Sequence, residues 1–176
     1  MLGSSRTFQN IRLFKEMTVL DNIKIAYHNQ MNYSFFDAIL KNTKYHEQEQ
    51  DANQTALELL KVFHMEDDKD KISKNLPYGK QRKLEIARAL ATDPKVLLLD
   101  EPAAGMNPQE TEELMETIKL LKTKFKISIL LIEHDMKLVM GICERIVVID
   151  YGRIIAKGSP KDIRKNPDVI KAYLGE

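Results

Sequence analysis

This chain has a single cysteine, no large excess of positive or negative charge, and no long apolar run. Its one cysteine, Cys143, excludes an internal disulfide and suits a reducing cytosol. The formal net charge is only +1 at pH 7, so the chain lacks the basic field that marks a nucleic-acid-binding protein. We therefore expect no nucleic acid among its partners.

Membrane-spanning and secretory segments are also missing. The longest apolar runs, such as residues 127–132, are far too short to span a bilayer. The first residues show no cationic flank followed by an apolar block, so no secretory signal is predicted. The composition that remains, 43% hydrophobic and 30% charged over 176 residues, is that of one soluble globular domain. We expect a cytoplasmic protein that reaches a membrane only through a partner.

The most informative segment runs from Lys95 to Glu101 and reads Lys-Val-Leu-Leu-Leu-Asp-Glu. Its four apolar residues, 96–99, predict a strand buried on both faces. Asp100 and Glu101 follow at the C-terminal end of that strand, where open α/β sheets build their ligand sites. Two adjacent carboxylates are costly there unless a cation or a reaction needs them. The segment is either a solvated acidic turn or a Walker-B-type metal and base site, and its flanks favour the second.

The first half of the chain is predicted to be helical after an irregular opening at residues 1–15. Thr18 and Asp21 resemble a capping box with Asp in place of Glu, which predicts a short helix through Tyr27. A longer helix is predicted from about Glu47 to Phe63, and residues 31–44 carry no clear pattern.

From Lys80 onward, helix and strand alternate. Such alternation predicts a parallel sheet with crossover helices, and the turn at residues 150–152 predicts a hairpin. Two short helices are expected after Ser159 and Pro167. The fold class is therefore α/β, with an all-helical lobe inserted before an α/β lobe. The predicted helices are 80–91, 108–125 and 136–143, and the predicted strands are 96–99, 127–132, 145–150 and 153–157.

Three further segments gain meaning from their order. Residues 76–82, Leu-Pro-Tyr-Gly-Lys-Gln-Arg, lead into a helix, and a glycine at a helix N-terminus lets backbone N–H groups approach an anion. Taken alone, this segment is equally a turn and a helix cap. His134 ends the next strand and is expected at the same sheet edge as Asp100 and Glu101. Gln9 precedes the helical lobe and means nothing in isolation.

Together, in this order and spacing, these segments resemble the ATP-binding cassette ATPases. Gln9 matches the Q-loop, residues 76–80 the signature motif, 97–101 Walker B, 104–107 the D-loop and His134 the switch histidine. The resemblance implies a partial P-loop NTPase fold with a mostly parallel sheet, flanking helices and an inserted helical subdomain. It divides the chain into a Q-loop segment at 1–17, a helical subdomain at 18–92 and an α/β subdomain at 93–176.

The resemblance also implies roles for residues and a requirement for ATP and Mg²⁺. Asp100 would hold the metal, and Gln9 would sense the metal and the attacking water. Glu101 would polarise that water, and His134 would contact the γ-phosphate. The signature and D-loop residues would contact ATP held by a second cassette, so that two cassettes enclose two nucleotides. These ATP-binding residues are Leu76, Pro77, Tyr78, Gly79, Lys80 and Asn107.

Within the family, the chain is most similar to ATP-binding subunits of branched-chain (hydrophobic) amino acid importers. The signature form Leu-Pro-Tyr-Gly and the segments 82–88, 101–108 and 166–175 carry this similarity. It implies a peripheral position on the inner face of the cell membrane. The implied partners are transmembrane permease subunits, a second ATP-binding subunit and, indirectly, a periplasmic or extracellular solute-binding protein. Pro77, Tyr78, Lys80 and Asn107 depart from the general family pattern and resemble subfamily variants.

The phosphate-binding loop of the family is absent. None of the seven glycines allows a Gly-x-x-x-x-Gly-Lys-[Ser/Thr] motif, which in the family wraps the phosphates before the Q-loop. The chain thus resembles a cassette without its N-terminal nucleotide-gripping lobe, through truncation, a misplaced start codon or a frame break. Two hypotheses stay open: an importer ATPase subunit, or a non-catalytic truncated remnant. A soluble cassette protein of translation or DNA maintenance would need basic patches, a second cassette or a coiled-coil insertion, and none is present.

Overall fold

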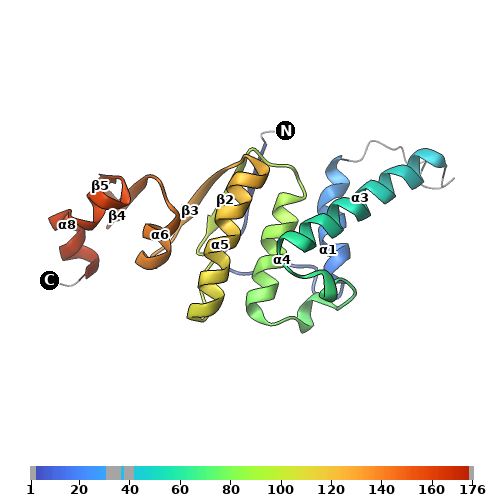
Figure 1. Ribbon diagram of the computed structural model, residues 1–176, viewed down its shortest axis with the longest axis horizontal. Coiled ribbons are helices and arrows are strands. Elements are labelled where there is room, and N and C mark those ends of the chain that lie inside the picture. Colours follow the sequence, from blue (N-terminus) through green and yellow to red (C-terminus); the bar gives the residue numbers. More distant parts are fainter. Residues whose placement is uncertain (1–2, 31–36, 38–41, 175–176) are drawn as a thin grey trace. The chain divides into compact units, whose positions relative to one another are not determined.

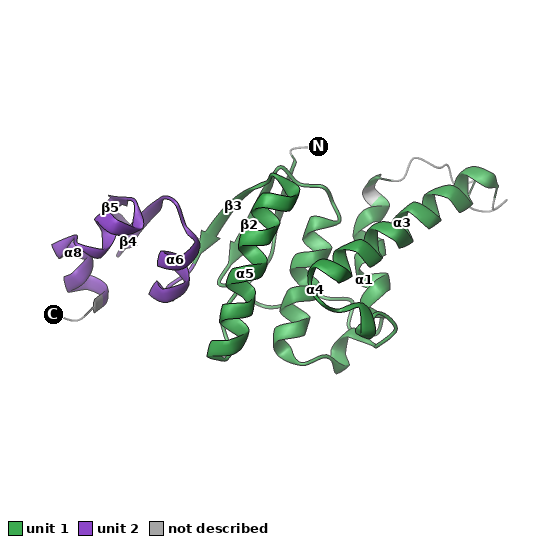
Figure 2. Cartoon of the chain, in the orientation of Figure 1, with its two compact units in different colours: residues 1–132 green, residues 133–176 purple. Residues whose placement is uncertain are grey.

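The structure is a computed structural model that describes residues 3–30, 37 and 42–174. The chain forms two compact units, Met1–Ile132 and Glu133–Glu176 (Figure 2). Most of segment 31–44, which carries no clear sequence pattern, and Gly175 lie outside the described residues. The functional boundaries at residues 17/18 and 92/93 stay a prediction.

Three helices form the main core of the first unit: α1 (Val19–Tyr27), α3 (Thr43–Val62) and α4 (Tyr78–Leu90). They pack beside one another, with α1 in contact with both of the others (Figure 1). Their facing side chains are small or branched apolar residues spaced by a helical turn, which is why they close into a dry layer. All of the following are at most 4% exposed: Val19, Ile23, Ala52, Ala56, Leu59, Leu60, Leu84, Ile86 and Ala87.

The ends of these helices follow their capping residues. The Thr18 hydroxyl accepts a hydrogen bond from the Asp21 N–H at 3.0 Å, which confirms the predicted start of α1. Helix α3 begins at Thr43 rather than near Glu47, because the Asn42 side chain accepts from the Tyr45 N–H at 3.0 Å. Short 3-10 turns at His28–Gln30, Glu66–Asp68 and Ser73–Asn75 connect the helices.

A three-stranded parallel sheet completes the first unit. Its strands are β1 (Ser4–Arg6), β2 (Val96–Asp100) and β3 (Ser128–Ile132), in the order β1-β2-β3. Ser4 lies opposite Val96, and Val96 lies opposite Ser128. Parallel strands β2 and β3 are joined by helix α5 (Pro108–Phe125), which lies over β2 in Figure 1. Helix α5 keeps the bounds that the sequence predicts.

Strand β1 corrects the expectation of an irregular opening at residues 1–15. Ser-Ser-Arg has no apolar alternation, so its own sequence does not favour a strand. It becomes one because β2 offers a free row of backbone groups, and pairing satisfies both chains. Thr7 continues the register, and its N–H donates to the Leu98 carbonyl at 2.9 Å.

The predicted burial of β2 on both faces is also wrong. Leu97 and Leu99 are 0% exposed on the face covered by helices, but Val96 is 37% exposed. Strand β3 shows the same alternation, with Leu130 and Ile132 55% and 53% exposed. An apolar run signals a strand with two covered faces only when both layers of cover are present. Among the described residues of the first unit, none covers the second face of this sheet.

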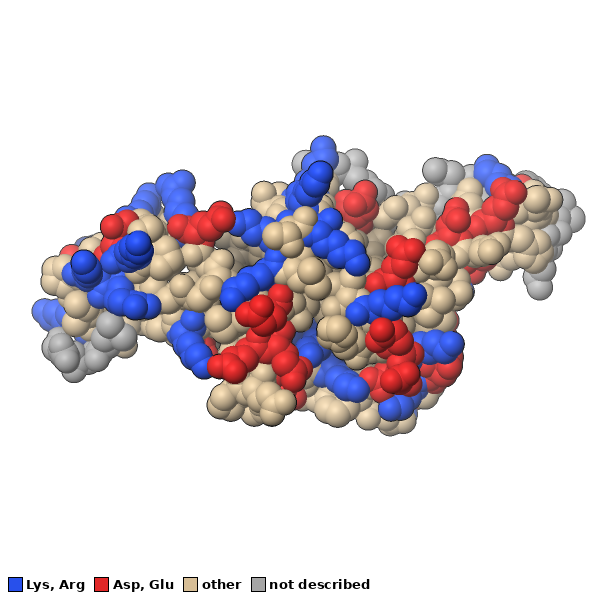
Figure 3. Space-filling model, viewed as in Figure 1, with Lys and Arg blue, Asp and Glu red and all other residues tan. Residues whose placement is uncertain are grey.

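Helix α5 carries its charges in two groups. Glu110, Glu112, Glu113 and Glu116 lie in its first half, and Lys119, Lys122 and Lys124 lie in its second half. Figure 3 shows acidic side chains gathered over one end of this helix. The order complements the helix dipole, which favours negative charge near the N-terminus and positive charge near the C-terminus.

The second unit is built around an antiparallel hairpin of β4 (Ile146–Asp150) and β5 (Arg153–Gly158), which confirms the predicted hairpin. β4 pairs with β5 in a sheet of its own, rather than extending the parallel sheet as the alternation predicts. Helices α6 (Met136–Ile142), α7 (Pro160–Arg164) and α8 (Pro167–Val169), followed by a π-helical turn at Ile170–Leu174, complete the unit. Its core contains Ile146, Val148, Ala156, Ile163 and Val169. None of the described helices is both long enough and apolar enough to cross a membrane.

Candidate functional site

Asp100 and Glu101 lie where β2 ends, as the sequence predicts. The Asp100 carboxylate is 22% exposed, and its Oδ2 lies 2.7 Å from Nη2 of Arg6 on the neighbouring strand. Glu101 has a φ of +44°, a backbone conformation that is uncommon for a residue with a side chain. Its N–H donates to the Ile132 carbonyl at 2.9 Å, so β3 holds this strained turn in place. Strain of this kind is concentrated at functional sites.

Gln9 lies beside Glu101, although the two residues are far apart in the sequence. The Gln9 Nε2 donates to Glu101 Oε2 at 2.9 Å. The pairing follows from β1, because that strand delivers residues 7–9 to the same edge at which β2 ends. Three of the predicted site residues, Gln9, Asp100 and Glu101, are therefore brought together. Their chemical roles stay a prediction.

The signature segment 76–80 forms the entry to helix α4. Leu76 is buried, Pro77 occupies the position before the first helical residue, and the Tyr78 ring is 43% exposed. Gly79 packs so closely against helix α5 that an added Cβ would lie 2.5 Å from Glu110 Oε1. A residue with a side chain at this position would have to displace the Glu110 carboxylate.

Lys80 has a structural partner. Its Nζ lies 2.5 Å from Oδ2 of Asp68, and Lys71 Nζ lies 2.6 Å from the other oxygen of the same carboxylate. The Asp68 side chain is only 4% exposed. The hydrogen bond from Lys71, followed by that from Lys80, holds the pKa of Asp68 below its usual value. Lys80 is thus anchored beside the signature turn.

Asn107 closes the segment between β2 and α5. Its side chain accepts from the Glu110 N–H at 2.9 Å, and Glu110 Oε2 accepts from the Asn107 N–H at 3.0 Å. This reciprocal capping box starts helix α5. Gly105, with a φ of +77°, provides the turn before it, and an added Cβ would lie 3.3 Å from the Tyr78 ring. The D-loop and signature segments therefore touch within one chain.

His134 belongs to the second unit. It directly precedes Asp135, whose side chain caps α6 by accepting from the Leu138 N–H at 3.0 Å. The His134 side chain is 71% exposed, and its Nδ1 lies 3.9 Å from Glu133 Oε2. The expected position of His134 beside Asp100 and Glu101 stays a prediction.

Sequence reasoning missed a buried ion pair on helix α4. Arg82 is 0% exposed, and its Nη1 lies 2.8 Å from Oε2 of Glu85, which is 3% exposed. Both residues contact the segment that carries Gln9. Opposite charges three residues apart within an otherwise apolar helix face were the available signal, because charges there are buried only when they are paired.

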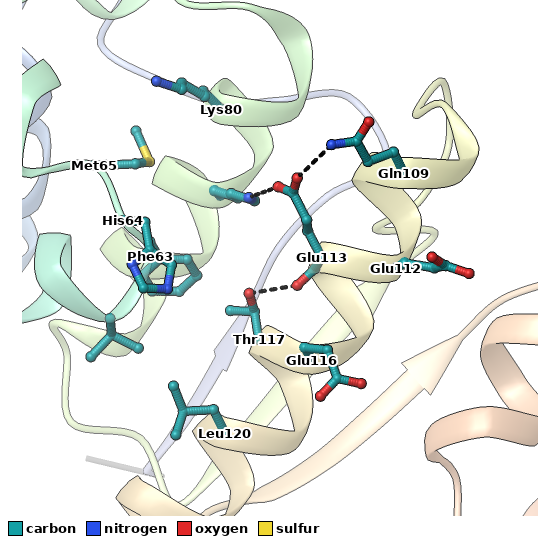
Figure 4. A pocket seen from close by; sticks show the side chains of 12 residues that line it. Phe63, His64, Met65, Lys80, Gln109, Glu112, Glu113, Glu116, Thr117 and Leu120 are labelled. Carbon is teal, nitrogen blue, oxygen red and sulfur yellow. Dashed lines mark hydrogen bonds and ion pairs between the residues drawn. The ribbon is translucent and has the colours of Figure 1, made fainter.

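A cavity in the first unit lies away from Glu101. It has a volume of about 620 Å³ and is lined by the end of α3, by α4 and by α5. Figure 4 shows Phe63, His64 and Met65 on one side and Gln109, Glu113 and Thr117 on the other. Lys83 crosses this space to Glu113 at 2.7 Å. Within the described residues, no three His, Cys, Asp or Glu side chains lie close enough together to hold a metal ion by themselves.

Comparison with known proteins identifies relatives along the whole chain. A family model described as "ABC transporter" matches residues 3–104, and one described as "Branched-chain amino acid ATP-binding cassette transporter" matches residues 153–176. The high-affinity branched-chain amino acid transport ATP-binding protein LivG of Escherichia coli K12 is 49% identical over 175 residues, which cover 99% of this chain and 69% of LivG. BraF of Pseudomonas aeruginosa, with the same description, is 48% identical over 99% of this chain and 68% of BraF.

A solved structure shares the fold. The ADP conformation of MJ1267, an ATP-binding cassette of an ABC transporter, matches with a TM-score of 0.77 and 30% sequence identity. The match covers 99% of this chain and 69% of MJ1267. The predicted fold class, with its helices flanking a parallel sheet, is confirmed.

Proposed function

The chain belongs to the ABC transporter family, and we propose that it is the ATP-binding subunit of an importer for branched-chain amino acids. Relatives described as branched-chain amino acid transport ATP-binding proteins match nearly its full length, and they support this substrate class. The proposal includes the resemblance-based partners: permease subunits on the inner face of the membrane, a second cassette and, indirectly, a solute-binding protein.

One observation carries the catalytic part of the proposal. The Gln9 amide contacts Glu101 at 2.9 Å, at the end of the strand that also presents Asp100. In this arrangement Glu101 accepts a proton from the attacking water, and Gln9 orients the Glu101 carboxylate. The hydrogen bond from Gln9 holds the Glu101 carboxylate in place, on a backbone with a φ of +44°. His134 and the signature residues act on the γ-phosphate from the two sides of a cassette dimer.

The residues at this edge fit a magnesium ion. The Asp100 carboxylate and the Gln9 amide oxygen are hard oxygen donors of the kind that Mg²⁺ prefers, and water completes the shell of such sites. Asp100 would release Arg6 to bind the ion, which supplies charge neutralisation at the phosphate. The phosphate-binding loop does not share this fit, because the 176 residues contain no Gly-x-x-x-x-Gly-Lys-[Ser/Thr] motif. No step of hydrolysis is therefore assigned to residues 1–176 acting alone, and we propose that these residues by themselves do not hydrolyse ATP.

The first test measures phosphate release by purified residues 1–176. We expect a rate no higher than that of the Glu101→Gln variant. A missing phosphate loop removes several charge-assisted hydrogen bonds of about 1.5–3 kcal/mol each, and every 1.4 kcal/mol is roughly a tenfold loss of affinity. A saturable ATPase rate above that of the variant would contradict the proposal that residues 1–176 by themselves do not hydrolyse ATP.

The second test restores the phosphate loop through a fusion ahead of residue 1. The fusion should hydrolyse ATP, and Glu101→Gln should abolish turnover while ATP still binds. In an Escherichia coli strain without LivG, the fusion should restore uptake of labelled leucine. An active ATPase that restores no uptake would overturn the importer assignment, and near-full activity of Glu101→Gln would overturn the role of Glu101.

A further inference from the structure

The buried guanidinium of Arg82 contacts two segments of the proposed site. Its Nη1 donates to the Phe8 carbonyl at 2.5 Å, and its Nη2 donates to the Gln9 carbonyl at 2.6 Å. The same Nη2 lies 3.2 Å from the hydroxyl of Tyr78 in the signature segment. One side chain of helix α4 therefore touches the backbone on which Gln9 is mounted and the first residue of its own helix.

Glu85 adds a second contact between helix α4 and the segment around Gln9. Its Oε2 accepts from Arg82 at 2.8 Å, and its Oε1 accepts from the Arg12 N–H at 3.0 Å. Helix α4 thus holds the chain at Phe8 and Gln9 on one side and at Arg12 on the other. The Gln9 side chain points from this clamped backbone to Glu101.

The contacts continue beyond Tyr78. An added Cβ on Gly105 would lie 3.3 Å from the Tyr78 ring, so this ring rests on the turn that leads into Asn107. A chain of direct contacts then runs from Glu101 through Gln9, Arg82 and Tyr78 to Gly105. All of these residues lie in the first unit.

Stability alone is a poor reason for such a pair. Buried ion pairs are often no more stabilising than apolar side chains of the same volume, because both charges lose their hydration. The Nε of Arg82 is also buried without a hydrogen-bond partner among the described residues. What an arginine offers here is geometry, since its planar fork can bind two carbonyls and a carboxylate at fixed angles.

We propose that Arg82, oriented by Glu85, is a positioning residue that couples the signature segment to Gln9. The inference rests on the proposed function for the meaning of Gln9, and Arg82 itself touches none of the reacting atoms. A shift of the Gln9 backbone has to carry the start of α4 with it or break two charge-assisted hydrogen bonds. The state of Glu101 and the position of the signature segment therefore change together.

Hydrogen exchange of residues 1–176 tests this coupling without nucleotide. The reporter is the Arg12 amide, measured by mass spectrometry on a peptide that spans residues 8–14. Arg82→Lys should accelerate its exchange at least tenfold, because the three donors of an ammonium radiate from one atom and cannot reproduce the planar fork that reaches both carbonyls and Glu85. Arg88→Lys is the matched control, since it makes the same change on the same helix beside Phe14, and it should leave the rate within twofold of wild type.

Tyr78→Phe separates coupling from simple structural support. It removes one hydroxyl from a 43% exposed ring, so the fold and the thermal midpoint should persist. Arg12 exchange should nevertheless rise two- to threefold, and this rise should vanish in the Arg82→Lys background. Additive effects of the two changes, or an unchanged rate in Tyr78→Phe, would overturn the proposal. Should Arg82→Lys fail to fold, the Tyr78→Phe rate alone decides.

Kinetics of the fusion that carries a phosphate loop provide a second readout. Arg82→Lys should lower kcat about tenfold with KM for ATP changed less than twofold, because positioning of Gln9 affects the reaction rather than the binding of substrate. A rise in KM alone would contradict the role. If the fusion shows no ATPase activity while the exchange coupling holds, the proposed function fails and the contact chain stands.

Discussion

The helices and the sheet of the first unit bury their apolar side chains to very different extents. Leu60 and Leu84 in the helical layer are 0% exposed, whereas Leu130 and Ile132 on β3 are more than half exposed. The helices obtain their cover from one another, through contacts among α1, α3 and α4. Within the described residues of the first unit, the sheet is covered on one face and open on the other. The exposure of each layer thus follows from how many of its faces other elements of the first unit cover.

The strongest test of this contrast compares two identical substitutions. Leu60→Ala should lower the free energy of unfolding by about 2–5 kcal/mol, because it leaves a cavity in a closed layer. Leu130→Ala should cost less than about 0.5 kcal/mol, since its side chain is 55% exposed. Urea titrations of both variants measure the difference. Equal losses would mean that the face of β3 is covered in solution, and the contrast would fail.

Aggregation should follow the open sheet face. Contiguous exposed apolar side chains recruit other chains, and Val96, Leu130 and Ile132 share one face by register. We expect residues 1–176 to bind an apolar dye and to aggregate as concentration rises, and Leu130→Lys with Ile132→Thr should reduce both several-fold. Leu120→Lys is the control, because Leu120 is 43% exposed on α5. A monodisperse wild-type monomer without dye binding would contradict this expectation.

Local patterns in the sequence predicted most of the elements. Helix α5 and the β4–β5 hairpin follow from signals inside their own segments, a proline near the start of the helix and a glycine in the turn. Strand β1 and the open face of β2 could not be predicted in this way. Both depend on which other segments pair with the strand or cover it. Nothing in the sequence Ser-Ser-Arg indicates that it pairs with β2.

The candidate site divides in the same way. Motif order pointed to Gln9, Asp100 and Glu101, and the structure brings these residues together. The contacts of Lys80 with Asp68 and of Arg82 with the Gln9 carbonyl needed coordinates, because they join segments with no shared local pattern. The relation of His134 to these residues stays a prediction.

In the helical layer, the ion pairs of Asp68 with Lys71 and Lys80 provide the next test of stability. Asp68→Asn keeps the shape but loses the charge that binds Lys71 and Lys80, so it should cost about 1–3 kcal/mol at pH 7. Folding lowers the pKa of Asp68 below its ordinary 3.8, so the charged carboxylate favours the folded state. Its contribution is complete above pH 3.8 and is lost as pH falls through the lower folded value. Unfolding titrations from neutral to acid pH should show wild type and Asp68→Asn converging, and a gap that persists unchanged at low pH would contradict the assignment.

The smallest expected effect lies at the boundary between the two regions. Lys83 of α4 meets Glu113 of α5 at 2.7 Å across the cavity in Figure 4, and so it links the helical layer to the helix that covers the sheet. The Glu113 side chain is 50% exposed, so the pair should contribute only about 0.2–1 kcal/mol. Its hydrogen bond with Lys83 lowers the pKa of Glu113, so this contribution is present above pH 4.5 and fades as pH falls further.

A double-mutant cycle of Lys83→Gln and Glu113→Gln measures this coupling directly. The coupling should shrink in high salt, because exposed charges are screened. Glu116→Gln is the control, since Glu116 pairs with Lys119 inside the same helix and leaves the boundary untouched. A coupling above about 2 kcal/mol would exceed what exposed pairs contribute. The helical layer and the sheet covered by α5 would then be joined by a strong electrostatic contact. The two layers would be expected to unfold together as one cooperative unit, and the sheet would not be a weakly attached layer.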